Sequence, residues 1–165
     1  MSEVAIAPAT PADVPLIVAL IRELAEYEKL AHEAKASEGD IHAALFGGRR
    51  YAEALIARVP GDAGEAADAG FGLFFHNFST FTGRPGLWVE DVYVRPALRG
   101  RGIGKALFAA MARIALERGC ARMEWSVLDW NKPAVDFYRS IGARAMDEWT
   151  IQRLTGEALA RLARG

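Results

Sequence analysis

Apolar residues near the start of the chain recur at helical spacing. They are Leu16, Ile17, Leu20, Ile21 and Leu24, which form one face of an α-helix. A helix start precedes them: Thr10 is a suitable N-cap, Pro11 suits the first helical position, and Asp13 is an acid in the first turn. This pattern predicts a short strand over residues 4–7 and a helix that ends near Tyr27.

A second cap signal follows. Ser37, with Asp40 three residues later, predicts a short helix to about Phe46, which Gly47 and Gly48 end.

The middle of the chain carries short runs of β-branched and aromatic residues. Residues 51–59 and 71–78 are expected to form an antiparallel hairpin, joined by a flexible loop of small residues, PGDAGEAADAG. Residues 88–94, WVEDVYV, predict a further strand that contains Glu90 and Asp91 and ends before Pro96.

The last part of the chain alternates helix and strand signals. Ile103, Leu107, Met111 and Ile114 predict a helix that ends near Gly119. Strands are then expected over 123–128 and 143–154, with a helix between them that Asn131 caps and Gly142 closes, and a last helix that Thr155 caps. The order indicates an α/β fold with a mixed sheet and helices on its faces.

Composition narrows the class of protein. With 165 residues, 52% of them hydrophobic, the chain can bury the core of one domain, expected over 1–165. A net charge of −1 and a pI near 6.3 argue against a nucleic-acid partner held by bulk electrostatics.

Several signals favour a cytoplasmic protein. Cys120 is the single cysteine, so no internal disulfide can form. The start carries an acid, Glu3, and no basic stretch before an apolar run, so no signal peptide is expected. No apolar run approaches the roughly 18 residues of a membrane span, so no membrane partner is expected.

Positive charge is concentrated around one turn, RPALRGRGIGKALFAAM, at residues 95–111. Three glycines with Arg99, Arg101 and Lys105, ahead of a helix, favour a cradle for a phosphate group. An ordinary glycine-rich connection with surface arginines is the plain alternative. An ATP-type loop does not fit, because Ala106 stands where Ser or Thr would bind magnesium.

A dinucleotide fingerprint G-x-G-x-x-G fails as well, although Asp129 lies about where an acid would meet a ribose. The motif that fits is R-x-x-G-x-G, at residues 99–104. With it, the chain resembles the GNAT superfamily of N-acyltransferases, whose loop reads [QR]-x-x-G-x-[GA]. It is most similar to the diamine acetyltransferases in three blocks, IAPATPADVPLIVALIRELAEYE, LWVEDVYVRPALRGRGIG and DWNKPAVDFYRSIGA.

The resemblance implies a mostly antiparallel sheet that splays between strands 88–94 and 123–128 to hold acetyl-CoA as cosubstrate, with no metal. It assigns the backbone of Val92, Tyr93 and Val94 to the pantetheine and thioester. The loop that would bind the pyrophosphate comprises Arg99, Gly100, Arg101, Gly102, Ile103, Gly104 and Lys105. Asn131 is a further CoA contact or only a helix cap.

The resemblance also implies the catalytic groups. A primary amine, with a pKa near 10, arrives as ammonium and must lose a proton before it attacks. Glu90 is then the base, directly or through water; the alternative is a solvent-facing residue or an ion pair. Tyr27 and Glu28 hold the distal part of the amine, although Lys29 weakens their negative field, and Asp91 supports the fold.

Tyr138 is assigned to the CoA site as the general acid that protonates the leaving thiolate. Its alternative is a core aromatic beside Phe137. The predicted function is direct acetyl transfer to a small diamine, polyamine or lysine-like amine, by a homodimer. Alternatives are an antibiotic or a protein N-terminus as acceptor, a noncatalytic acyl-CoA module, and a nucleotide-dependent oxidoreductase.

Overall fold

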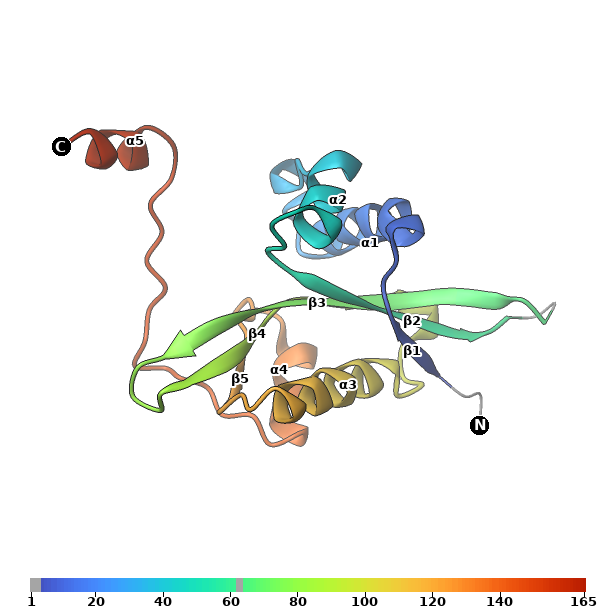
Figure 1. Ribbon diagram of the computed structural model, residues 1–165. Helices are drawn as coiled ribbons and strands as arrows, with labels where there is room; N and C mark the ends of the chain where they lie inside the picture. Colours follow the sequence, from blue (N-terminus) through green and yellow to red (C-terminus); the bar gives the residue numbers. More distant parts are fainter. Residues whose placement is uncertain (1–3, 62–63) are drawn as a thin grey trace. The chain divides into compact units, whose positions relative to one another are not determined.

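The computed structural model describes residues 4–61 and 64–165, in two compact units, 1–126 and 127–165 (Figure 1). Residues 1–3, which include Glu3, and residues 62–63, within the expected flexible loop, lie outside the described part. The expectation of one domain over 1–165 stays a prediction.

A five-stranded sheet forms the centre of the first unit. Its strands are β1 (Ala5–Pro8), β2 (Glu53–Pro60), β3 (Ala66–Ser79), β4 (Arg84–Val94) and β5 (Met123–Glu124). They lie in the order β1-β2-β3-β4-β5; the first three pairings are antiparallel and the pairing of β4 with β5 is parallel. The predicted mixed, mostly antiparallel sheet is confirmed.

Helices cover both faces of this sheet (Figure 1). The α-helices of the first unit are α1 (Val14–Tyr27), α2 (Glu38–Phe46) and α3 (Ile103–Glu117), and its 3₁₀ turns are η1 (Pro11–Asp13), η2 (Ala31–Glu33) and η3 (Pro96–Leu98). Phe71 and Leu73 of β3 belong to one core cluster with Ile17 and Leu20 of α1. A side chain at Gly72, between them, would instead meet Met111 of α3 at 3.4 Å, so α1 and α3 pack on opposite faces.

Both predicted helix starts are confirmed. The Thr10 N–H donates to Asp13 Oδ2 at 2.8 Å, and the Asp40 N–H donates to Ser37 Oγ at 3.1 Å. These bonds satisfy donors that a helix start leaves unpaired.

The end of α1 is fixed by a left-handed residue. Lys29 has φ +61°, and the Leu30 N–H bonds back to the Ala25 carbonyl at 2.8 Å. A residue other than glycine is uncommon in this conformation. Tyr27 therefore lies in the last turn of α1, and Glu28 follows it as the C-cap residue.

Several strands differ in length from the prediction. β3 and β4 begin earlier than expected because their small residues pair across the sheet; Ala67, for example, lies opposite Val59. β5 is shorter than the predicted 123–128, since only Met123 and Glu124 pair, with Leu87 and Trp88 of β4.

The second unit contains α4 (Lys132–Ser140) and α5 (Gly156–Arg164). Asn131 caps α4, because its Oδ1 accepts from the Ala134 N–H at 3.4 Å, and Thr155 is the N-cap of α5. The predicted strand over 143–154 is wrong: the structure assigns no strand to these residues. Alternation of apolar and polar residues suits a strand, but a strand also needs a neighbouring backbone edge.

Candidate active site

A β-bulge in β4 shapes the acidic part of the site. Asp91 lies opposite Leu73 and Val89 lies opposite Phe74, so Glu90 is an extra residue in the pairing. In a regular strand Glu90 and Asp91 would point to opposite faces. The bulge re-aims one of them. The Trp88 indole N–H donates to Glu90 Oε2 at 3.0 Å, which places the Glu90 carboxyl on the side of Trp88.

Trp88 and Asp91 share the face of the sheet that α1 covers. Trp88 lies opposite Phe75 and Asp91 opposite Leu73, and these two β3 residues are two positions apart. Leu73 packs in the α1 core cluster. Glu90 and Asp91 are therefore both presented on the α1 side of β4.

Three carboxyl groups interact there. Burial, together with the negative fields of Glu90 and Glu28, raises the pKa of Asp91 from its usual value near 4 to about 7. Burial also raises the pKa of Glu28. Mutual repulsion among carboxylates is relieved by a proton or by a cation, so the cluster of Glu28, Glu90 and Asp91 would favour an ammonium group.

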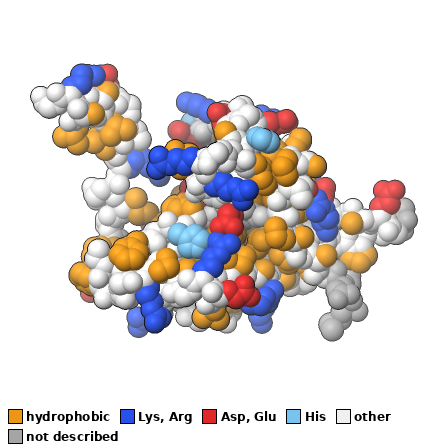
Figure 2. Space-filling view, viewed as in Figure 1, with side chains coloured by type: hydrophobic (Ala, Val, Ile, Leu, Met, Phe, Trp, Pro, Cys, Tyr) orange, Lys and Arg blue, Asp and Glu red, His pale blue; other side chains and the backbone are white. Residues whose placement is uncertain are grey.

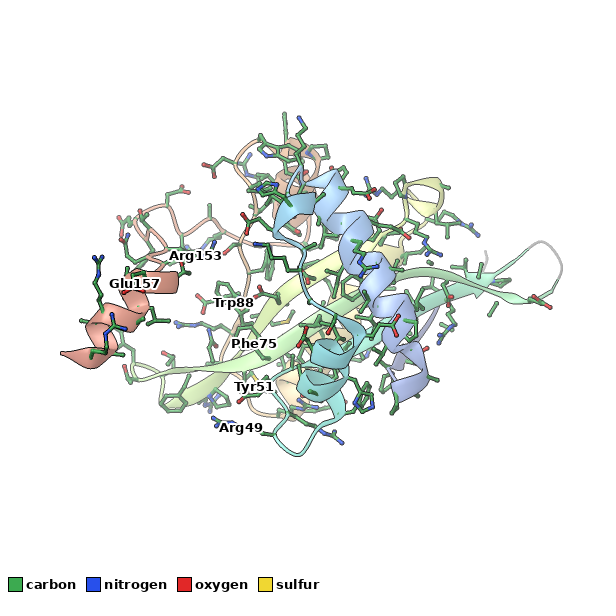
Figure 3. The ribbon with its side chains drawn as sticks, turned by 90° about the horizontal axis from the view of Figure 1, so that it is seen from above. Arg49, Tyr51, Phe75, Trp88, Arg153 and Glu157 are labelled. Atoms are coloured by element: carbon green, nitrogen blue, oxygen red, sulfur yellow. The ribbon has the colours of Figure 1, made fainter. Side chains whose placement is uncertain are left out.

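Aromatic side chains continue this surface along the sheet. The Phe75 and Trp88 rings, on adjacent strands, have centroids 6.4 Å apart (Figure 3). Ahead of β2, the Arg49 guanidinium lies 5.1 Å from the centroid of the Tyr51 ring. The Phe75 and Trp88 rings, which are tilted to each other beside the carboxylates, offer a cation an electron-rich face as well as a negative charge.

The other end of β4 presents an open backbone edge. β5 pairs only with Leu87 and Trp88, so among the described residues no strand pairs with Val92, Tyr93 and Val94 on that side. An open strand edge offers N–H donors and carbonyl acceptors to a ligand. This is the splayed sheet that the sequence predicts.

The glycine turn after β4 has the geometry of an anion cradle. Gly100 and Gly102 have φ +76° and +79°, where L side chains are strained, and a Cβ at either position would meet no heavy atom within 4 Å. The first backbone bond of α3 runs from the Ala106 N–H to the Gly102 carbonyl at 2.9 Å. The N–H groups of Ile103, Gly104 and Lys105 therefore precede the helical ladder and can bind a pyrophosphate.

The charged side chains of this turn differ in direction. The Arg99 Nε–H donates to the Val94 carbonyl at 2.9 Å, and the Arg99 guanidinium carbon lies 4.6 Å from the centroid of the Tyr27 ring. Arg99 therefore extends toward the end of α1. Arg101 and Lys105 are both exposed around the start of α3.

Asn131 and Tyr138 belong to the second unit. Asn131 is 8% exposed and fills its predicted role as a helix cap. The Tyr138 ring lies 5.6 Å from the Phe137 ring, and both are half-buried. Their predicted contacts with CoA remain predictions.

Sequence reasoning assigned Asp91 to the fold and missed its place in the carboxylate cluster. Two consecutive acids in an apolar strand are the only signal in the sequence, since the bulge that brings them together depends on the pairing with β3.

The surface charge of the described residues is mixed in sign. On the face drawn in Figure 2, basic and acidic side chains are interspersed. Among residues 4–61 and 64–165, no helix is both long and apolar enough to cross a membrane. The same residues contain no group of three or more His, Cys, Asp or Glu arranged to hold a metal ion.

Comparison with known proteins identifies the class. The profile of the acetyltransferase (GNAT) family matches residues 69–143. Thialysine N-epsilon-acetyltransferase of Sus scrofa is 41% identical, with 99% of each chain covered. L-ornithine N5-acetyltransferase of Arabidopsis thaliana is 31% identical, over 92% of this chain and 84% of that protein.

A solved structure shares the fold. An integron cassette protein from the mobile metagenome of V. cholerae superimposes with a TM-score of 0.78 and is 27% identical, with 98% of each chain covered. The chain belongs to the GNAT acetyltransferase family. It is an N-acetyltransferase, and this family uses acetyl-CoA as cosubstrate. This removes the oxidoreductase and the noncatalytic module as alternatives.

Proposed function

We propose that the protein transfers the acetyl group of acetyl-CoA directly to a primary amine of a small diamine, polyamine or lysine-like amine. The observation that carries this proposal is the cluster of Glu28, Glu90 and Asp91. Burial and the negative fields of Glu90 and Glu28 raise the pKa of Asp91, and cationic groups on an acceptor would offset the repulsive part. The names of the relatives add support, since thialysine and L-ornithine each carry a second amine.

The acidic residues and Tyr27 divide the work on the amine in this proposal. Glu90 removes a proton from the ammonium, and its hydrogen bond from Trp88 holds the carboxylate in one direction. Tyr27 and Glu28, at the end of α1, bind the distal amine. Asp91, which the sequence did not assign to the site, adds negative charge next to Glu90.

The cosubstrate supplies the acetyl group as a thioester when it is bound. The backbone of Val92, Tyr93 and Val94 would hold its pantetheine, and an N–H of this edge would donate to the thioester oxygen where negative charge develops. The backbone amides from Gly100 to Lys105, in the turn that Arg99 opens, would hold the pyrophosphate. Asn131 would contact CoA, and Tyr138 would give its phenolic proton to the CoA sulfur.

The test is CoA release across an amine panel, with the product identified by mass spectrometry. Thialysine, ornithine, lysine and spermidine represent the proposed class; an aminoglycoside and a peptide with a free N-terminus represent the other acceptors. Acetylation of the small diamines at the highest kcat/KM supports the proposal. Turnover confined to the aminoglycoside or the peptide contradicts it.

Direct transfer has its own test. Protein mixed with acetyl-CoA alone should keep its intact mass, because no side chain is acetylated on the way to the amine. If the protein instead gains the mass of one acetyl group, and that group moves to the amine when amine is added, the reaction has a covalent intermediate.

We also propose a homodimer, in the cytoplasm, without a metal. The resemblance to the diamine acetyltransferases supports association with another copy. Light scattering should give twice the 17.9 kDa chain mass, and a monomeric mass would refute the dimer. Full activity after dialysis against a chelator is expected for a reaction without a metal.

A further inference from the structure

The Arg99 side chain links two regions of the first unit. Arg99 opens the R-x-x-G-x-G turn, yet its Nε–H bonds to the Val94 carbonyl at 2.9 Å. Its guanidinium carbon lies 4.6 Å from the centroid of the Tyr27 ring and 5.6 Å from that of the Tyr93 ring. One planar cation therefore contacts an aromatic ring of α1 and one of β4.

The Tyr93 ring is anchored from the α1 side. Tyr93 is 5% exposed, and burial and its hydrogen bond with Glu23 raise the pKa of its phenol. Glu23 in turn pairs with Arg95 at 2.9 Å. Arg99 thus rests against a ring that cannot move freely.

The Tyr27 ring is less buried than the Tyr93 ring and packs against the core cluster to which Tyr93 belongs. It is half-buried in the last turn of α1, directly before Glu28. A guanidinium stacks flat on such a ring and fixes its plane, which a lysine ammonium does not do, because it is a compact point charge.

We propose that Arg99 is a positioning residue for the amine substrate: its guanidinium holds the Tyr27 ring, and with it the end of α1, in the orientation that receives the distal amine. This inference rests on the proposed function. In this inference the Arg99 side chain acts on the binding of the amine, while the backbone amides from Gly100 to Lys105 bind the pyrophosphate of acetyl-CoA.

The test compares Arg99→Lys with Arg101→Lys, a matched change two residues along the same turn. Arg99→Lys keeps the positive charge but loses the planar stack and the Nε donor, so the diamine KM should rise about fivefold or more. The acetyl-CoA Kd should change less than about twofold. Arg101→Lys should leave the diamine KM unchanged and affect only acetyl-CoA.

A double-mutant cycle isolates the contact. In a Tyr27→Leu background, Arg99→Lys should add no further rise in KM, whereas in a Tyr27→Phe background, which keeps the ring, the rise should persist. The same double-mutant cycle, measured by the melting temperatures of the variants, detects the contact between Arg99 and Tyr27 without any assay of turnover. Arg99→Gln is the second variant if Arg99→Lys unfolds.

The outcomes separate this inference from the proposed function. If the wild type acetylates no diamine, the proposed function fails and the inference with it. If the wild type is active on diamines but Arg99→Lys alters only the acetyl-CoA Kd or only the melting temperature, the inference alone is overturned. A KM effect that is undiminished in the Tyr27→Leu background overturns it as well.

Discussion

The carboxyl group of Asp91, on β4, interacts electrostatically with that of Glu28, at the end of α1, although the two residues are far apart in the sequence. Glu90 adds a third negative charge beside Asp91. This electrostatic interaction joins acidic groups of α1 and β4, and it makes the protonation of Asp91 sensitive to pH and to cations.

Asp91→Asn should stabilise the protein in a way that depends on pH. The pKa of Asp91 is about 7 in the folded protein and near 4 in an unfolded chain. The folded state therefore binds the extra proton, and stability falls as pH rises from 4 to 7 and stays low above 7. Because water reaches part of the side chain, we expect a gain of about 1–2 kcal/mol at pH 8, or roughly 3–6 °C in Tm, and little change at pH 4.

Melting curves at pH 4 and pH 8 check this expectation. Asp129→Asn, at an exposed position, is the control and should shift Tm equally at both values. A gain for Asp91→Asn that is the same at both pH values would mean that ionisation of this carboxyl does not limit stability.

Glu90→Gln should slow turnover by on the order of 10² at neutral pH, because it removes the proton acceptor but keeps the shape and the place for the Trp88 hydrogen bond. Part of the rate should return at high pH, where the amine is already neutral. Steady-state rates from pH 6 to 10 measure this. A variant with the wild-type profile would exclude Glu90 as the base.

Gly104→Val tests the pyrophosphate cradle without straining the backbone. A Cβ at Gly104 would approach only the Val94 side chain, at 4.0 Å, so the free protein has room for it. A bulky side chain should block the approach of the phosphates and weaken acetyl-CoA binding at least about tenfold, or about 1.4 kcal/mol. Calorimetric titration gives the Kd.

Gly104→Ala is the matched control, since the family motif accepts Ala at this place. It should retain most of the affinity. Equal affinity of the Val variant and the wild type, with unchanged Tm, would remove Gly104 from the cosubstrate site.

Tyr138→Phe should lower kcat about 10- to 10³-fold with little change in acetyl-CoA affinity or Tm, because the proton it donates matters mainly in the transition state. A packing role beside Phe137 predicts the opposite result: unchanged kcat and a stability change of about 1 kcal/mol at most. Phe137→Tyr is the control and should supply no proton to the reaction.

Local signals in the sequence predict the parts of the fold that local contacts decide. Thr10 with Asp13, Ser37 with Asp40, and Asn131 all cap helices as expected, because a cap needs only three or four neighbouring residues. The glycine turn likewise follows from its own residues, since Gly100 and Gly102 adopt the conformations that glycine favours.

Features that depend on distant pairing could not be predicted. Residues 143–154 have the alternation of a strand but form none, because a strand forms only where another edge accepts its backbone bonds. The bulge at Glu90 depends on the register with β3. For the same reason the sequence did not predict that Asp91, assigned there to the fold, joins the carboxylate cluster.

The most direct test of the central claim compares 1,4-diaminobutane with butylamine, a monoamine of the same carbon chain, in the wild type and in Glu28→Gln. The acidic surface at α1 and β4 predicts that the wild type prefers the diamine about tenfold or more in kcat/KM at low salt. It also predicts that Glu28→Gln loses most of this preference through a higher KM for the diamine alone. Equal kcat/KM for the two amines in the wild type, or equal effects of Glu28→Gln on both, would contradict the account.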